Sequence, residues 1–284
     1  DVLSSSEFLI DADATFKFPL DNFHRQLNDL YINTTLSYLG GKFENSYEAR
    51  NQLKHSFFTI GLHPTYKFLV QDLAIQLGAK TYFSLDIENK DNNFFIYPDV
   101  EISYPIVKDF ANVFIGASGD LETNSYQSLA DKNPYISPTQ QISQTNNKYN
   151  VFAGIRGKLD AQFSYNFKAS YSDIENNPFF SLNQSKSSGS NIAGADAFTF
   201  FGYEFGNSFK TEYDDIKLIS FFGEAAFNGI KNLTVGMNVQ FNKFTLTNLQ
   251  EPWNAPKIKG ELFGTYKTDK WFAGANFFFV GERK

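Results

Sequence analysis

The sequence predicts an all-β fold, a transmembrane antiparallel up-and-down β-barrel that is incomplete in this chain. Apolar and polar residues alternate along most of the chain, the pattern of strands with one apolar and one wet face. The alternating segments reach about ten residues or more, enough to cross a bilayer at a tilt, whereas strands in soluble sheets average about five or six. Aromatic residues make up 18% of the chain, mainly 33 Phe and 15 Tyr, and these side chains favour sheet surfaces and membrane interfaces.

The first six predicted strands lie in the N-terminal half of the chain. In the first of them, Ile10 and Phe16 fall on the face opposite Asp11 and Asp13. The second strand alternates less clearly, and the other four repeat the pattern of the first. The predicted ranges are 8–18, 30–39, 53–68, 73–86, 94–106 and 111–122.

Six more strands are predicted in the C-terminal half. Val151 and Ile155, for example, face away from Asn150 and Arg156. No segment of useful length has the 3.6-residue period of a helix, so twelve strands and no helix are expected. The predicted ranges are 149–159, 162–173, 209–227, 233–246, 257–267 and 270–281.

The connections between these strands alternate between short and long. Barrels of the outer membrane have short periplasmic turns and long extracellular loops, so the short connections are predicted to be periplasmic. Residues 198–205 resemble a strand, but a span there would move the next short turn to the outside, so they are assigned to an extracellular loop. The short connections are 69–72, 107–110, 160–161, 228–232 and 267–270, and the long ones are 40–52, 87–93, about 123–147, about 174–208 and 247–256.

This arrangement predicts a single, partial outer-membrane β-barrel domain over residues 1–284. Its first strand would run downward from outside and its twelfth would end outside, near Lys284. A complete bacterial barrel has both termini in the periplasm, so we expect at least one further strand on each side, at least fourteen in all. The predicted location is the outer membrane of a Gram-negative bacterium, with outer-membrane lipid as the first partner. A soluble β-solenoid or surface adhesin is a third possibility, but it would need a fixed repeat that the sequence lacks.

Composition argues against several other functions. The net charge of −6 and the lack of a basic stripe disfavour nucleic acid as a partner, and the absence of Cys excludes disulfides and thiolate metal sites. His55 and His63 would share a strand face, but eight residues of strand separate them by about 26 Å, too far for one metal ion. No Ser lies in a G-x-S-x-G sequence, and carboxylate pairs such as Asp99 and Glu101 arise on any polar strand face. No catalytic residue, metal site or cofactor is predicted.

Two groups of residues are candidates for a collective role. The polar strand faces would either set the electric field of a lumen or form salt-bridge ladders that fill a narrow interior; they contain Asp11, Asp13, Lys80, Asp99, Glu101, Asp120, Glu122, Arg156, Lys158 and Lys168. Aromatic side chains in the predicted loops would either bind a ligand or partner or pack loop against loop. The loop candidates are Tyr126, Tyr135, Phe179, Phe180, Phe198, Phe200, Phe201, Tyr203 and Trp253.

Four segments resemble plug-less proteins of the TonB-dependent receptor family: residues 97–104 (YPDVEISY), 133–138 (NPYISP), 154–172 and 254–283. The resemblance is to the barrel half of the family and covers most of the chain. It implies an outer-membrane receptor fold, and members of the full family import scarce nutrients with energy from an inner-membrane complex. This sequence shows neither a globular plug domain nor a segment that would engage the energising protein, so a passive pore, a scaffold subunit and an incomplete receptor all stay open.

Two functions therefore follow as predictions. The first is a transport or pore role for a small solute across the outer membrane. The second is a non-transporting structural or docking barrel within an outer-membrane protein complex, which would contact other envelope proteins through its extracellular loops or periplasmic turns. Neither is an enzymatic function.

Overall fold

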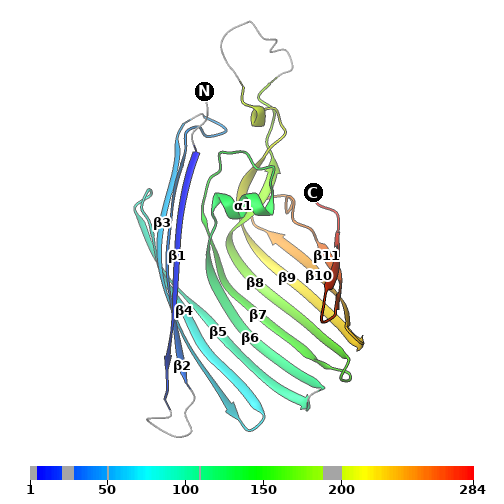
Figure 1. Ribbon diagram of the computed structural model, residues 1–284. Coiled ribbons are helices and arrows are strands. Elements are labelled where there is room, and N and C mark those ends of the chain that lie inside the picture. The colour runs from blue at the N-terminus through cyan, green and yellow to red at the C-terminus, as the bar shows by residue number, and fades with distance from the viewer. Residues whose placement is uncertain (1–4, 21–28, 50, 109, 188–199) are drawn as a thin grey trace.

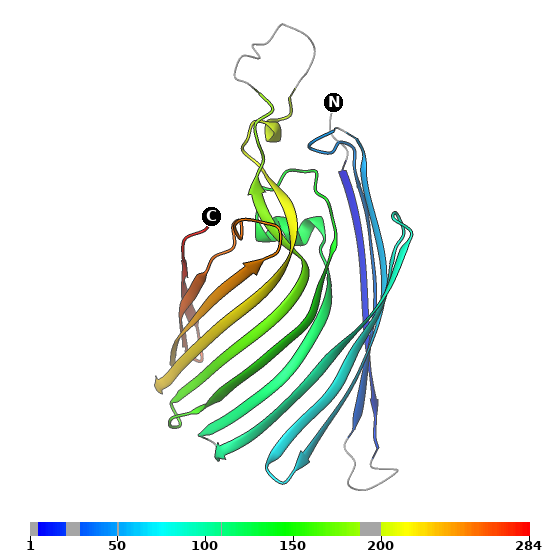
Figure 2. The ribbon, with the colours of Figure 1, turned by 180° about the vertical axis from the view of Figure 1, so that it is seen from behind.

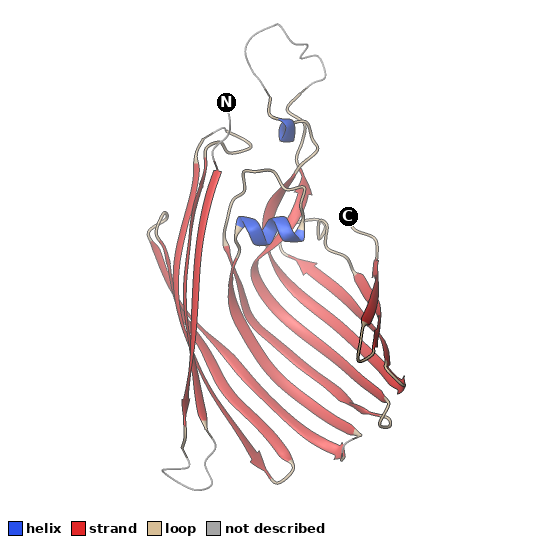
Figure 3. Cartoon of the chain, in the orientation of Figure 1, coloured by secondary structure: helices blue, strands red, loops and turns tan. Residues whose placement is uncertain are grey.

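Twelve strands form one antiparallel sheet in the computed structural model, which describes residues 5–20, 29–49, 51–108, 110–187 and 200–284 (Figures 1, 2 and 3). Each strand pairs with its neighbours in the chain, the order of an up-and-down barrel wall. Among the described residues, β1 and β12 pair on one side only, so the sheet is open. The strands are β1 (Ser5–Phe18), β2 (Leu30–Phe43), β3 (Leu53–Val70), β4 (Leu73–Asp86), β5 (Asp91–Val107), β6 (Ala111–Thr123), β7 (Gln144–Lys158), β8 (Phe163–Leu182), β9 (Phe209–Ile230), β10 (Leu233–Leu246), β11 (Ile258–Lys267) and β12 (Phe272–Val280).

The predicted all-β fold and its twelve strands are confirmed, with corrections at several boundaries. β7 begins at Gln144 and β8 continues to Leu182, so the predicted loops 123–147 and 174–208 shorten to 124–143 and 183–208. The predicted loop 87–93 is a turn over 87–90, because β5 starts at Asp91. A short helix, α1 (Tyr126–Lys132), lies in the first of the long loops, contrary to the expectation of no helix. No helix within the described ranges is long and apolar enough to span a membrane.

The strand register sorts side chains into an outer and an inner face. One row of paired residues crosses nine strands from β3 to β11 and is apolar throughout: Phe68, Ile75, Ile102, Ile115, Ala153, Ala169, Phe221, Phe241 and Ile258. The neighbouring row is one residue away along each strand and therefore points to the opposite face. It carries Lys67, Gln76, Glu101, Gly116, Phe152, Ser170, Ser220 and Asn242.

The outer face leaves its apolar side chains uncovered. Ile115 is 56% exposed and Phe221 is 54% exposed, although both lie in the middle of long strands. At the two edges, Phe16 is 51% and Phe277 is 71% exposed. No soluble core buries these residues, as a sandwich fold would require, so the apolar face is a surface suited to lipid.

The two-residue turns lie at one end of the strands and most of the long connections at the other (Figure 1). The exceptions are the turn 87–90, which lies at the long-connection end, and the connection 19–29, which lies at the short-turn end. At one end, β3–β4 and β9–β10 turn in two residues, with Gln71 and Asn232 at positive φ (57° and 67°), as tight hairpins require. Predicted turn 107–110 lies at this end too, but its residue 109 falls outside the described residues. The other end carries the connections 44–52, 124–143, 183–208 and 247–257. The predicted strand-like stretch 198–205 does not form a span: residues 198–199 lie outside the described residues, and Gly202–Glu204 form a 3-10 turn.

Candidate functional site

The inner face carries a ladder of paired charges between β3 and β7. Lys80 Nζ lies 2.6 Å from Asp120 Oδ2, and Arg156 Nη2 lies 2.9 Å from Glu101 Oε1. Lys132 of α1 lies 3.1 Å from Glu122, at the upper end of β6. Five of the ten predicted inner-face charges are thus in ion pairs. The ladder therefore offers mixed, locally neutralised charge rather than a one-sign filter.

His63 belongs to this ladder, and its geometry does not fit nucleophilic catalysis. Its Nε2 lies 2.8 Å from Asp99 Oδ2 and 3.0 Å from Thr65 Oγ1. A catalytic relay needs the carboxylate and the hydroxyl on different ring nitrogens, so that one orients the ring while the other gives up its proton. Here both partners share one nitrogen. The cluster is a polar contact within the wall.

Residues 124–143, which we call the inner segment, lie across the concave side of the sheet near the long-connection end (Figure 1). Asn124 links the two ends of this segment, because its Nδ2 donates to Ser143 O and Thr145 Oγ1, both at 2.9 Å. Ser125 caps α1, and the Ser125 and Ser128 side chains bond each other's backbone N–H. This reciprocal capping explains how a helix of seven residues forms here.

The N-terminal end of the inner segment is held by β1, β2 and β3. The carboxylate of Glu7 accepts the backbone N–H of Tyr126 at 2.7 Å and that of Gln127 at 3.3 Å. The ring of Tyr126 packs 5.7 Å from that of Phe43. Burial, together with the nearby Glu7 carboxylate, raises the pKa of Tyr126 above its usual value, so its phenol stays neutral.

The other end of the inner segment is held by β9. The backbone of Phe209 bridges to it on both sides, donating to Tyr135 O at 3.0 Å and accepting from Ser137 N at 2.8 Å. Gln140, which is 2% exposed, donates through Nε2 to Phe209 O at 3.0 Å and accepts from Thr211 N at 2.8 Å. The same Nε2 also donates to the backbone oxygen and Oγ of Ser137, so this buried amide both shapes the inner segment and attaches it to β9.

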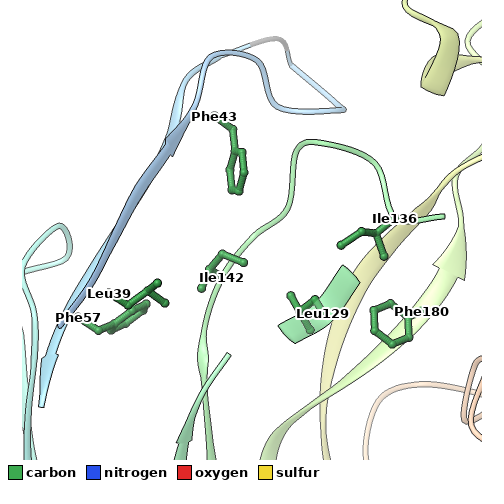
Figure 4. Close-up of a cluster of buried hydrophobic side chains, with 7 residues drawn as sticks. All are labelled: Leu39, Phe43, Phe57, Leu129, Ile136, Ile142 and Phe180. Atoms are coloured by element: carbon green, nitrogen blue, oxygen red, sulfur yellow. The ribbon is translucent and has the colours of Figure 1, made fainter. Parts of the chain in front are cut away.

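A hydrophobic cluster lies under the inner segment and joins the two halves of the sheet (Figure 4). Leu129 and Leu39 are fully buried, and the cluster draws its members from β2, β3, the inner segment and β8. Its buried residues are Leu39, Phe43, Phe57, Leu129, Ile136, Ile142 and Phe180.

Two adjoining cavities open above the inner segment, and we call them together the vestibule. Their volumes are about 640 and 510 Å³, and both are lined by Tyr47, Glu48, Lys210 and Glu212. The first cavity also touches residues 139–141 and 143, so the inner segment lies at its border, and Trp253 lines the second. Lys210 Nζ pairs with Glu212 at 3.0 Å, which neutralises one charge pair inside.

The loop over residues 44–52 is tied to the loop over 183–208. The Tyr47 hydroxyl donates to Gln184 O at 2.7 Å, and Lys186 donates to Tyr47 O and lies 4.6 Å from the centre of its ring. Lys186 also pairs with the buried Glu204 at 3.0 Å. Burial and the carboxylates of Glu204 and Glu48 raise the pKa of Tyr47, so this phenol remains a donor.

The predicted loop aromatics fall into three groups. Phe179 and Phe180 lie on β8 and are buried (1% and 8% exposed) in two different hydrophobic clusters, so they are strand residues rather than loop residues. Tyr126 packs against the cluster beneath the inner segment, and Trp253 packs against the second cluster of Ile174, Phe179 and Ile216.

The remaining loop aromatics lie in the connection 183–208 and in the inner segment. Tyr203 packs 6.2 Å from Tyr47, and Phe201 stacks on Tyr203 at 5.7 Å. Phe200 packs 6.1 Å from Phe205, edge to face, whereas Tyr135 is 68% exposed. Phe198 lies outside the described residues.

Several residues that hold the site together could not be identified from the sequence. Glu7 and Gln140 act through contacts 119 and 71 positions away, and their residue types carry no motif. Asp214, which is 2% exposed, accepts the backbone N–H groups of residues 247, 248 and 249 and so fixes the β10–β11 connection. Within the described ranges, no three His, Cys, Asp or Glu side chains gather as a metal site would need.

Solved structures of the same architecture are outer-membrane receptors and transporters. The copper transporter OprC matches over 98% of this chain with 10% identity and a TM-score of 0.51. The pyoverdine receptor FpvA of Pseudomonas aeruginosa PAO1 matches over 93% with 13% identity and a TM-score of 0.55. The iron transporter FrpB of Neisseria meningitidis matches over 94% with 11% identity and a TM-score of 0.55.

The chain spans about half of these proteins or less, namely 53%, 39% and 41% of their lengths. No protein-family profile matches the sequence, and no curated protein matches it. At 10–13% identity the likeness concerns the fold. The chain therefore has the barrel-wall fold of the TonB-dependent outer-membrane receptors.

Proposed function

We propose that this chain is part of the wall of an outer-membrane β-barrel in a Gram-negative bacterium, with a transport or pore role for a small solute. The observation that carries the proposal is the pair of neighbouring rows described above, one apolar across nine strands and one mainly polar. Such rows would present an apolar exterior to lipid and a wetted interior to solute.

The long connections are placed on the extracellular side in this proposal, and the short turns in the periplasm. The vestibule would then open to the outside and receive the solute before it meets the inner segment. Its lining of amides, hydroxyls, a Lys–Glu pair and Glu48 suits a polar solute. The comparison proteins named for copper, pyoverdine and iron support transport as the kind of activity.

A non-transporting barrel that docks other envelope proteins is the second candidate. The exposed side chains of Tyr135 (68%) and Phe205 (51%) favour it, because large apolar groups at a rim often mark a protein contact. The two candidates share the barrel and differ in whether solute passes.

Reconstitution of the complete protein in planar bilayers tests the proposal. Ion conductance, or flux of a small polar solute into liposomes, is expected if the protein transports or conducts. A barrel that inserts but stays sealed, and that co-purifies with envelope proteins, would instead establish the docking function. Extraction from membranes without detergent would contradict both.

A further inference from the structure

We infer that the inner segment is a built-in closure of the passage, which limits solute flow until its attachments to β1 and β9 are released. The inference rests on the proposed function, because it presupposes a passage along the concave side. A strand-to-strand connection in a barrel normally stays at the rim, where its backbone can reach water. This one runs inward and is held there.

The attachments lie on strands that the sheet order keeps far apart. β1 and β9 are separated by seven intervening strands, and the inner segment contacts both. Glu7 holds the N-terminal end through two backbone N–H groups, and Gln140 holds the C-terminal end. A single connection therefore reaches across the concave side rather than along one wall.

The inner segment is packed as an interior element, although it belongs to a loop. Asn124, Leu129 and Ser137 are each 0% exposed. Its apolar side chains lie on Leu39, Phe43 and Phe57, which belong to the inner face of β2 and β3. A segment seated this way fills space that the polar interior would otherwise leave to water and solute.

The attachments are also of a kind that can be released. They include hydrogen bonds made by two individual side chains, Glu7 and Gln140, and by the Tyr213 hydroxyl, which contacts Ser143 N and Gln141 O. No continuous strand ladder holds the described inner segment, because its one strand-type pairing with the sheet is the isolated bridge of Ile136 to Phe209. Removing the donors or acceptors of those two side chains leaves buried backbone groups without partners, which favours the detached state.

The test uses the complete protein with two release substitutions, Glu7→Ala and Gln140→Glu. Glu7→Ala removes the acceptor for the Tyr126 and Gln127 N–H groups. Gln140→Glu keeps the shape of the side chain but removes its donor and buries a charge. The matched control is Gln162→Glu, which makes the same change on an exposed side chain in the connection between β7 and β8, away from the inner segment and the lining of the vestibule.

A disulfide then separates release of the segment from damage to the barrel. Ile136 and Phe209 are bridge partners, so Ile136→Cys and Phe209→Cys place two thiols at a spacing suited to a disulfide, in a chain that has no Cys of its own. The pair is introduced into the release variant, and conductance in planar bilayers is measured before and after reduction.

We expect the release variant to conduct several-fold more than wild type, Gln162→Glu to conduct as wild type, and the oxidised disulfide to return the release variant to the wild-type level. A release variant that inserts and migrates as a folded barrel but conducts no more than wild type would overturn the inference. So would one that stays leaky with the disulfide formed. If the wild-type protein does not insert into bilayers at all, the proposed function fails first.

Discussion

Lys80 on β4 pairs with Asp120 on β6 by reaching across β5, with Nζ 2.6 Å from Oδ2. The same carboxylate accepts the Tyr82 hydroxyl at 2.8 Å through its other oxygen. One acidic side chain on β6 is thus linked to two side chains on β4, across β5, on the inner face. This contact shows how the polar face of the wall satisfies its own charges and stiffens the sheet.

Asp120→Ala is therefore expected to lower the free energy of unfolding. The substitution leaves Lys80 and Tyr82 without their acceptor, and a loss of about 0.5–1.5 kcal/mol follows for a group that water partly screens. Urea unfolding in lipid or detergent, followed by the loss of heat-modifiable gel migration, measures it. Asp11→Ala is the control, because Asp11 lies on the same face with no polar partner among the described residues. If the two substitutions lowered the free energy of unfolding equally, the contacts of Asp120 in the charge ladder would not be stabilising.

Substitution of Gly154, which lies against Phe114, tests the packing of the inner face. A Cβ at Gly154 would lie 2.3 Å from the backbone oxygen of Phe167 and 2.4 Å from Phe114 Cζ. Gly154→Ala is expected to cost about 1–3 kcal/mol, because the backbone of β8 cannot move away without breaking its pairing. At Gly264 the nearest atom to a new Cβ, Val235 Cγ1, is 3.8 Å away, so Gly264→Ala should be neutral or slightly stabilising. The midpoints of urea unfolding distinguish the two, and a loss of stability at both positions would argue against this packing.

Met237 and Asn238 are neighbours on β10 that face opposite sides of the sheet. Met237→Arg would place a charge on the apolar face, at a cost of about 2–4 kcal/mol near the bilayer midplane. Asn238→Arg would place the same charge between its register partners Glu224 and Glu261, where it gains ion pairs. The yield of folded barrel in lipid vesicles should fall sharply for the first variant and change little for the second. The reverse order would mean that the faces are assigned wrongly.

The positions of the strands could be predicted from the sequence because both faces of every strand are constrained, one by lipid and the other by water. The alternation of apolar and polar residues stops where the pairing register between neighbouring strands shifts. Predicted boundaries at residues 149 and 173 coincide with register shifts between Asn147 and Tyr149 and between Ile174 and Asn177. A bulge moves the following side chains to the other face, so a period-2 pattern stops there although the strand continues.

The candidate site was predictable only in part for a related reason. Exposed loop aromatics carry a compositional signal, but whether each one packs inward depends on contacts far along the chain. Phe179 and Phe180 become buried because β8 extends past the bulge beside β9. The inner segment gave no signal, because α1 has seven residues and is stabilised by Glu7, Ser125 and the cluster beneath it rather than by helical periodicity.

The two-faced wall is tested most directly by labelling β10 one residue at a time. Single cysteines at positions 236 to 241 of this Cys-free chain would each carry a spin label, with the protein in lipid vesicles. Relaxation by oxygen, which concentrates in lipid, and by a water-soluble nickel complex would then be compared. We predict that oxygen dominates at Met237, Val239 and Phe241 and the nickel complex at Gly236, Asn238 and Gln240. Uniform access of the nickel complex to all six positions would contradict the membrane-spanning wall.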